Sequence, residues 1–168
     1  MAAPAQKPQF ALDTNVLIDL GERLPFAHTF RGAYADRGLS VSPTVVQELT
    51  NIAFSKSHEA SNYAFEALAN MREWNIYPFD LKAVGHGIAE ADAQTLIRLK
   101  LLPDDELNDG LILIETALAC IPCLVTSDHH LLQIDRATLI KVLGDLDLIA
   151  VQIVHPKDLL RAVAPPGF

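Results

Sequence analysis

Four acidic residues, widely spaced along the chain, could together hold a metal ion. They are Asp13, Glu48, Asp109 and Asp128. Carboxylate oxygens are the ligands that hard divalent cations such as Mg²⁺ and Mn²⁺ prefer. A cation held in this way can activate water and stabilise both oxygens that are exchanged when a phosphodiester is cleaved. If the four side chains meet, the chemistry that they indicate is metal-dependent phosphoryl transfer.

Each of these acids also has an ordinary structural explanation. Asp13 and Asp128 could cap helices, Glu48 could be a solvated helix residue, and Asp109 could be a first-turn acid that the helix dipole favours. For any one of them the structural explanation is the stronger. Their joint placement favours a shared site, because like charges about 4 Å apart repel by several kcal/mol and a divalent cation removes that repulsion.

The segments around the acids predict the elements that position them. Five short runs are apolar or alternate as strands do, and helical segments of about 10 to 15 residues separate them. Such a pattern specifies a parallel sheet that is covered on both faces. We therefore predict an α/β fold, a three-layer α/β/α sandwich with a parallel sheet of about five strands. The expected strands are 9–12, 39–42, 75–79, 123–126 and 149–154, and the expected helices are 16–20, 43–53, 58–72, 88–101, 111–119, 136–143 and 156–163.

In this fold the four acids are expected at one edge of the sheet. Ligands of open parallel sheets bind beyond the carboxyl ends of the strands, and Asp13 and Asp128 each follow a strand. Glu48 lies about one and a half turns into the helix that leaves the second strand, so its side chain can reach back to that edge. Asp109 lies near the start of the helix that enters the fourth strand. Since this helix runs antiparallel to the strands, its first turns lie over the same edge.

Length and composition set further bounds. With 168 residues, half of them apolar, the chain can bury one core, and we expect a single domain at residues 9–163 with a disordered leader at 1–8 and a tail at 164–168. No apolar run reaches the roughly 20 residues of a membrane helix, and the first residues lack a secretory pattern, so we expect a cytoplasmic protein without membrane contact. The net charge of −8 argues against a broad basic surface for nucleic acid, but not against an enzyme whose carboxylates bind metal.

Cys120 and Cys123 are the two cysteines, and their C-x-x-C spacing raises a zinc or redox interpretation. A structural zinc site needs four ligands, and no second Cys or His pair stands at a suitable spacing. A free cysteine behaves as a small apolar residue. We therefore expect both thiols to be buried in the core.

Five segments, in order along the chain, form a set. They are Phe10–Ile18, with Asp-Thr-Asn after an apolar strand, then Val41–Leu49, Asn108–Ile112, Leu124–Asp128 and Val154–Leu160. In residue type and in order, this set resembles the PIN-domain ribonuclease family, which includes bacterial VapC-like toxins. The resemblance covers about residues 9 to 163.

This resemblance implies a metal-dependent endoribonuclease that hydrolyses phosphodiester bonds in single-stranded RNA. The four acids would then be the catalytic residues and the ligands of Mg²⁺ or Mn²⁺, with a metal-bound water as nucleophile. Asn15, Thr126 and Ser127 would orient the ligands by hydrogen bonds. Many bacterial members of the family are toxins that cut RNA, are inhibited by an antitoxin protein and form homodimers, whereas others process single-stranded or structured RNA without an antitoxin.

Residues beside the acids offer further candidates. Asp105 precedes Asp109 by one helical turn and could reach a second metal, or it could cap the helix. His129 and His130 could contact a substrate phosphate or assist proton transfer, or they could form a solvated turn. Gly110 stands where the family more commonly has Ala, which loosens a helix by up to about 1 kcal/mol.

Two other functions compete with the nuclease. A phosphatase of the haloacid dehalogenase type also begins with an apolar strand that ends in Asp, but that family uses Asp-x-Asp and this chain has Asn15 at the second position. The other is a catalytically inactive PIN-fold module that binds RNA or docks a protein. The presence of all four acids argues against it, because an inactive module gains nothing from side chains that repel one another.

Overall fold

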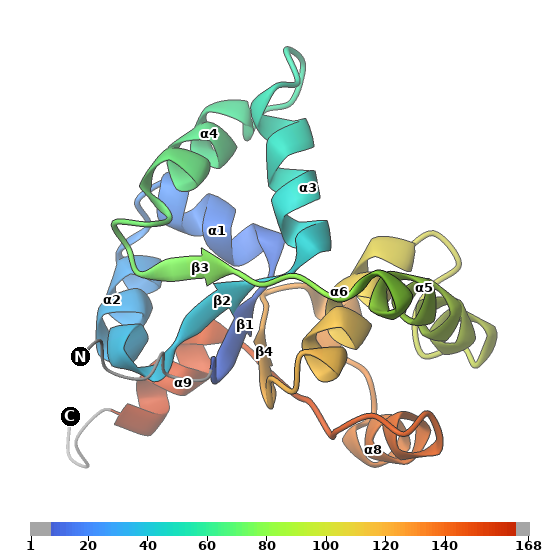
Figure 1. Cartoon of the computed structure of the whole chain (residues 1–168). Coiled ribbons are helices and arrows are strands. Elements are labelled where there is room, and N and C mark those ends of the chain that lie inside the picture. Colours follow the sequence, from blue (N-terminus) through green and yellow to red (C-terminus); the bar gives the residue numbers. More distant parts are fainter. Residues whose placement is uncertain (1–7, 164–168) are drawn as a thin grey trace, which may run out of the picture.

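The computed structural model describes residues 8–163 (Figure 1). The predicted leader, apart from Pro8, and the predicted tail at 164–168 lie outside these residues. Within the described part, none of the helices is long and apolar enough to cross a membrane.

A parallel sheet forms the centre of the molecule. In residues 8–163 it has five strands in the order β3-β2-β1-β4-β5, and all neighbouring strands are parallel. The predicted α/β sandwich with a parallel sheet of about five strands is confirmed. The strands are β1 (Phe10–Leu12), β2 (Leu39–Val41), β3 (Ile76–Pro78), β4 (Cys123–Val125) and β5 (Gln152–Val154).

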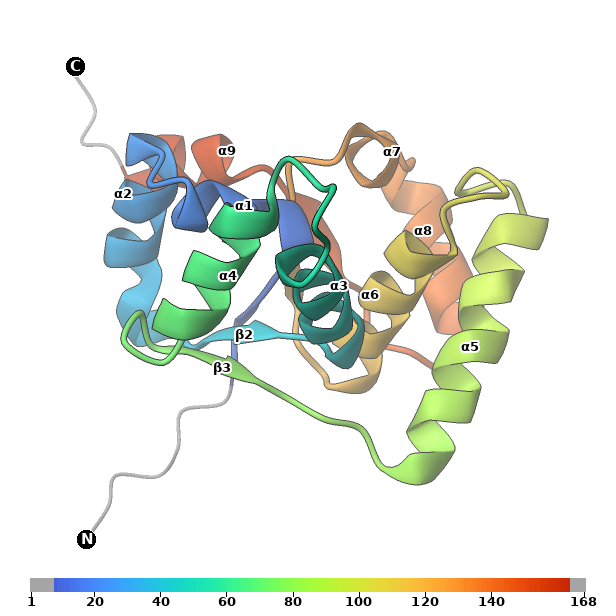
Figure 2. The ribbon, with the colours of Figure 1, turned by 90° about the horizontal axis from the view of Figure 1, so that it is seen from above.

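Helices connect every strand to the next. Two of them, α2 and α9, pack together at one end of the molecule, while α5 packs on α6 at the other end (Figure 1, Figure 2). The helices α1, α3 and α4 form a third group. The bounds are α1 (Thr14–Gly21), α2 (Pro25–Tyr34), α3 (Pro43–Ala53), α4 (Ser61–Asn70), α5 (Ala83–Arg98), α6 (Leu107–Leu118), α7 (His129–Leu132), α8 (Arg136–Asp145) and α9 (Pro156–Val163), with a 3₁₀ turn at Ala35–Arg37.

Several helices differ from the prediction. Helix α2 was not predicted, although Pro25 stands at its first turn and its buried residues Ala27, Phe30 and Tyr34 follow helical spacing. Helix α5 begins at Ala83 rather than at residue 88, and α6 begins at Leu107, so that Glu106 and not Asp105 is the residue before it. The strand predicted at 149–154 is confined to β5, its last three residues.

The arrangement of the central strands creates the place for a site. Strand β1 lies between β2 and β4. The chain continues from β1 to β2 and β3 on one side and only later reaches β4 and β5 on the other side. Leu12, Leu124 and Val125 are fully buried, which anchors the ends of β1 and β4 in the core. Asp13 follows β1, and its backbone N–H donates to the Val125 carbonyl over 3.0 Å. Beyond this bond the segments that follow β1 and β4 separate. This is the position at which open parallel sheets bind ligands.

Two residues singled out from the sequence have packing roles. A Cβ at Gly110 would lie 3.2 Å from the Cβ of Ala93, so the glycine lets α6 approach α5 closely. Cys123 is buried as expected, and burial raises the pKa of its thiol to about 12. The prediction for Cys120 was wrong. Its side chain is exposed, because it occupies a left-handed turn with φ 56° after α6.

Candidate metal centre

The four acids meet in one pocket. Its volume is about 360 Å³, and it lies at the carboxyl ends of β1 and β4, next to α1, α3 and α6. Its lining also contains polar and apolar residues that belong to α1 and α3. The pocket is lined by Asp13, Thr14, Asn15, Ile18, Glu48, Asn51, Ile52, Asp109 and Asp128.

Asp13 is the most deeply buried of the acids, with 3% of its surface exposed. It caps α1, because one carboxylate oxygen accepts a hydrogen bond from the Thr14 backbone N–H over 2.7 Å. The other oxygen accepts from the Thr126 hydroxyl over 2.6 Å. Burial raises the pKa of Asp13 to about 6, the charges of Glu48 and Asp128 add to the rise, and the bonds from Thr126 and Thr14 oppose it.

The residues predicted to orient the ligands form a network between the ends of β1 and β4. Asn15 donates to Asp13 over 3.3 Å, and its side-chain oxygen accepts from the backbone N–H of Ser127 over 3.2 Å. The Thr126 hydroxyl accepts from the backbone N–H of Asp128 over 2.9 Å while it donates to Asp13. Thr126 thus joins two of the acids directly, and Ser127 takes part through its main chain.

Glu48 reaches the pocket from the second turn of α3. This helix begins at Pro43 and is capped by Ser42, whose hydroxyl accepts from the Val45 N–H over 3.3 Å. Two donors hold the Glu48 carboxylate, which are the Thr14 hydroxyl and the side-chain amide of Asn108, the latter at 2.8 Å. Both donors belong to elements that carry other acids of the pocket, and neither was predicted from the sequence.

Asp109 lies in the first turn of α6. Its Oδ2 atom is shielded from solvent and has no hydrogen-bond partner in residues 8–163. The pKa of Asp109 is raised to about 8, first by burial and then by the charges of Asp13, Asp128 and Glu106. An unpaired oxygen in such surroundings is a suitable ligand for a cation, which would offset both the burial and the repulsion.

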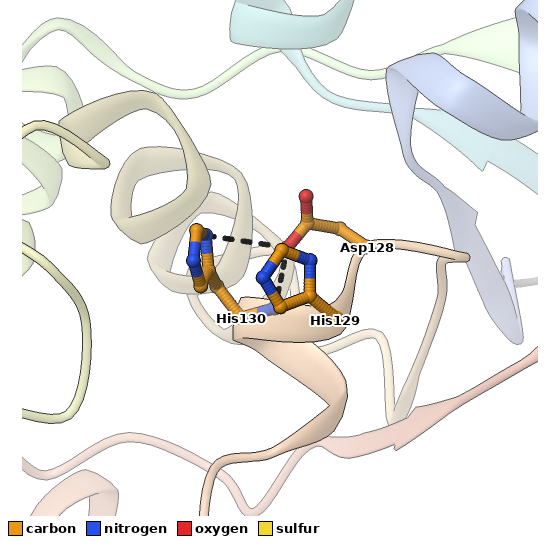
Figure 3. Close-up of side chains that lie close together, drawn as sticks. All are labelled: Asp128, His129 and His130. Carbon is orange, nitrogen blue, oxygen red and sulfur yellow. Dashed lines mark hydrogen bonds and ion pairs between the residues drawn. The ribbon is translucent and has the colours of Figure 1, made fainter.

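Asp128 stands at the start of the short helix α7. One of its oxygens accepts from the backbone N–H groups of His130, over 2.8 Å, and Leu131, over 3.3 Å. The carboxylate therefore caps α7 and lines the pocket at once. Figure 3 shows it beside the rings of His129 and His130.

The model of one protein family, described as the PIN domain, matches residues 10–137. The chain belongs to the PIN domain family. No curated protein matches this PIN domain.

Two solved structures are similar to this PIN domain in fold. VapBC2 from Rickettsia felis, bound to a DNA fragment from its promoter, is 15% identical over 87% of this chain and 97% of the other, with a TM-score of 0.59. FitAcB from Neisseria gonorrhoeae is 17% identical over 88% of this chain and 98% of the other, with a TM-score of 0.52. At such identities the likeness concerns the fold.

The residues just before α6 of the PIN domain differ from the expectation. Because the helix begins at Leu107, Asp105 lies in an exposed turn and is not on the helix face of Asp109. Glu106 is the residue that approaches the acids, and it contributes to the raised pKa of Asp109. Its Oε1 lies 3.1 Å from Nδ1 of His130. In the sequence Glu106 stands one helical turn before Asp109. Asp104 and Asp105, which precede it, are the more typical helix caps and drew the prediction to themselves.

The side chains of the pocket fit a hard divalent cation. All four acids offer oxygen donors, the groups around them hold these donors in place, and two of the carboxyl groups have raised pKa values because burial and neighbouring charges disfavour their ionised forms. A bound cation reverses that balance, since it favours ionised carboxylates. The same residues without a cation would remain partly protonated near neutral pH.

Proposed function

We propose that this PIN domain is a metal-dependent endoribonuclease that hydrolyses phosphodiester bonds in single-stranded RNA. The observation that carries the proposal is the convergence of the four acids on one pocket from four separate elements. Membership of the PIN family supports it. The raised pKa values of Asp13 and Asp109 support it as well, because strongly perturbed carboxyl groups in a pocket are typical of functional sites.

The proposed roles follow from the surroundings of each side chain. The four acids would hold Mg²⁺ or Mn²⁺, and the ion would activate water and neutralise charge on the scissile phosphate. Thr126 and Thr14 hold one oxygen each of Asp13 and Glu48 by hydrogen bonds. Each carboxylate is thereby fixed in orientation before a ligand arrives, which lowers the entropy cost of binding.

The pocket also offers contacts for a substrate beside the acids. Ile18 and Ile52 present apolar side chains, and Asn51 presents an amide. Recognition of single-stranded RNA relies on unpaired bases that stack on apolar surfaces and bond through their edges. These three residues are our candidates for contacts with the nucleotides next to the scissile phosphate.

We propose that the enzyme is the toxin of a toxin–antitoxin pair and that its partner is an antitoxin protein. We also propose that it forms a homodimer and acts in the cytoplasm. The toxin role rests on the family resemblance and on the two similar structures, VapBC2 and FitAcB. Expression of the chain alone should arrest growth, and the product of an adjacent small open reading frame should relieve the arrest. Unimpaired growth on expression of active enzyme would instead favour a role in RNA processing.

The test of the activity is a cleavage assay on single-stranded RNA with Mn²⁺ or Mg²⁺, with duplex RNA and single-stranded DNA as comparison substrates. Asp13→Asn and Asp109→Asn should lower the cleavage rate on the order of 100-fold or more, because each loses a charged ligand. Asp104→Asn is the matched control, since this exposed acid pairs with Lys100 on the surface. Activity that persists in both site variants, or RNA binding without any cleavage, would overturn the proposal.

A further inference from the structure

A second pocket adjoins the pocket of the four acids along α3 and α6. Its volume is about 300 Å³, and it is formed by α3, α5 and α6, with α6 between the other two helices (Figure 2). Both apolar and polar side chains contribute to it. The second pocket is lined by Pro43, Thr44, Gln47, His86, Glu90, Leu107, Leu111 and Glu115.

The two pockets lie one helical turn apart. On α6, Leu107 lines the second pocket and Asp109 lines the pocket of the four acids. On α3, Thr44 of the second pocket precedes Glu48 by four residues, which is about 6 Å along the helix axis. Neighbouring nucleotides of an extended strand have a similar spacing. An RNA strand whose scissile phosphate lies at the four acids can therefore place a neighbouring base in the second pocket.

A carboxylate lies at the inner end of the second pocket. Glu115 is 3% exposed and Thr44 is 6% exposed, whereas Gln47, His86 and Glu90 are exposed and form the mouth. Each oxygen of Glu115 accepts one hydrogen bond, and both donors belong to Thr44. An ionised carboxylate can accept about four hydrogen bonds. Glu115 therefore has acceptor capacity left for a ligand in the pocket.

The walls of the second pocket suit the faces of a nucleobase. Pro43, Leu107 and Leu111 are half-buried and present apolar side chains to it. At the mouth, Nε2 of His86 lies 3.1 Å from Oδ1 of Asp80, which holds the imidazole ring in place. Unpaired bases stack on histidine and aromatic rings and form hydrogen bonds through their edges. The pocket thus combines surfaces for the face of a base with an acceptor for its edge.

The chemistry of the buried carboxylate selects among the four bases. An ionised carboxylate only accepts hydrogen bonds. The Watson–Crick edge of guanine presents two adjacent donors, N1–H and the N2 amino group, which match the two oxygens of a carboxylate. Adenine and cytosine present one donor beside an acceptor, and uracil presents one donor between two acceptors. Since these acceptors repel a carboxylate, guanine is the base that fits Glu115.

We propose that the second pocket binds a guanine of the RNA substrate next to the scissile phosphate. Glu115 accepts from N1–H and the N2 amino group, the Gln47 amide donates to O6, and the ring of His86 covers the base. The inference rests on the proposed function, because it takes RNA as the substrate.

An arginine of a partner protein would also present two parallel N–H donors to Glu115. The base is favoured because the second pocket lies one turn from the four acids, and because an arginine leaves Gln47 and His86 without a role.

Binding of nucleosides to the full chain in EDTA, measured by ligand-observed NMR, tests the inference without any cleavage. Guanosine should bind on the order of 10-fold more tightly than inosine, which lacks the N2 amino group, and than adenosine, cytidine or uridine. Glu115→Gln replaces one acceptor with a donor and should remove the difference between guanosine and inosine. Equal affinities of the wild type for guanosine and adenosine, or tighter binding of methylguanidine than of guanosine, would overturn the proposal.

Matched variants guard against loss of folding and against surface binding. Glu73→Gln makes the same change at an exposed residue that does not line the second pocket, and it should retain the preference for guanosine. Gln47→Ala changes an exposed side chain of the pocket and serves if Glu115→Gln lacks the circular dichroism of the wild-type fold. It should weaken guanosine binding several-fold, and unchanged binding in Gln47→Ala and Glu115→Gln alike would contradict the proposal.

Cleavage assays then separate this inference from the proposed function. Oligonucleotides that carry guanine or inosine beside the scissile bond should differ in cleavage rate on the order of 10-fold with the wild type, and should be cleaved at similar rates by Glu115→Gln. RNA cleavage without any preference for guanine contradicts the guanine site and leaves the nuclease standing. Selective binding of guanosine by a chain that cleaves no RNA contradicts the nuclease and supports the guanine site.

Discussion

Asp13 and Asp128 each use one carboxylate for two purposes, as a helix cap and as a wall of the pocket. The N–H groups at a helix start carry partial positive charge, which offsets part of the repulsion among the acids. The capping role and the proposed functional role are therefore compatible in these residues. Substitution by Asn is the informative change, because Asn retains the cap and removes the charge.

Thr126→Val should weaken Mn²⁺ binding by about 10-fold or more, since Asp13 loses the hydroxyl that donates to it and Asp128 loses the acceptor of its backbone N–H. Thr126→Ser retains the hydroxyl and should restore the affinity. Isothermal titration calorimetry with Mn²⁺ measures both variants. Equal affinity of the Val variant and the wild type would show that the hydroxyl does not orient the ligands.

At the scale of residues, the sequence indicates the side chains that stand next to element ends. Asp13 and Asp128 follow strands, and Asn15 and Thr126 lie within two residues of them, so their meeting could be predicted. The donors to Glu48 could not, because Thr14 and Asn108 are 34 and 60 residues away from it and the choice of donor depends on how α3 packs. Whether the acids bind metal remains a prediction.

At the scale of elements, two polar bridges join α3 to α6, and these helices carry Glu48 and Asp109. One is the bond from Asn108 to Glu48. The other is Glu115, a buried carboxylate that accepts from the Thr44 hydroxyl over 2.8 Å and from the Thr44 N–H over 3.2 Å. Within residues 8–163 no basic side chain forms an ion pair with Glu115, and the N-terminus of α3 supplies its donors. The bridge thus holds α3 and α6, which carry Glu48 and Asp109, at a fixed separation.

Glu115→Ala should lower the free energy of unfolding by about 1 to 3 kcal/mol, because it leaves the Thr44 donors unpaired in the core. It should also weaken Mn²⁺ binding, since α3 is free to shift. Glu115→Gln retains an acceptor and should preserve most of both properties. Urea denaturation and Mn²⁺ titration measure the two effects, with Glu90→Ala on the exposed face of α5 as control. A loss of stability in Glu115→Ala without any loss of metal affinity would limit Glu115 to the core.

Helix α6 ends in a turn that favours glycine, although Cys120 occupies it. The Ile121 N–H donates to the Thr116 carbonyl, and the Cys120 N–H donates to the Ala117 carbonyl. This is the hydrogen-bond pattern of a helix that ends at a residue in the left-handed conformation. Cys120→Gly should therefore raise the free energy of unfolding by up to about 1 kcal/mol, whereas Cys120→Ala should not. Urea denaturation under reducing conditions distinguishes them, and equal stability of both variants would contradict the role assigned to the turn.

The elements that the sequence failed to predict have identifiable causes. The start of α5 was missed because Gly85 and Gly87 disfavour a helix on their own, and the packing of α5 on α6 overrides that preference. The start of α6 was misplaced because Asp104 and Asp105 are better caps than Glu106, which makes no capping bond with its side chain. The sequence therefore indicated Asp105, and not Glu106, as the acid that approaches Asp109.

At the scale of the whole molecule, the acids make stability depend on pH. The pKa values of Asp13 and Asp109 are raised to about 6 and about 8 in the folded protein, above the ordinary value of 3.8. Below pH 3.8 both carboxyl groups are protonated in the folded and in the unfolded protein. As the pH rises through the two raised pKa values, the unfolded chain ionises first, and the stabilisation by the protonated groups is lost.

The metal-free protein should accordingly lose stability between about pH 4 and pH 8. Asp13 contributes up to about 3 kcal/mol, and Asp109, which is partly exposed, contributes less than its pKa alone would give. Thermal unfolding in EDTA measures this loss, and Asp13→Asn should flatten the profile. Mn²⁺ should restore stability most strongly at high pH, because it binds the ionised carboxylates. A metal-free melting temperature that rises over this range would contradict the assignment.

The strand order has a consequence for synthesis. Thr126, which donates a hydrogen bond to Asp13, is translated 113 residues after it, and β4 completes the pocket only after β1, β2 and β3 have been made. Domains fold from the N-terminal side as translation proceeds. Under the proposed function, a nascent chain would therefore lack the completed pocket, and with it the cleavage activity, until β4 has been translated.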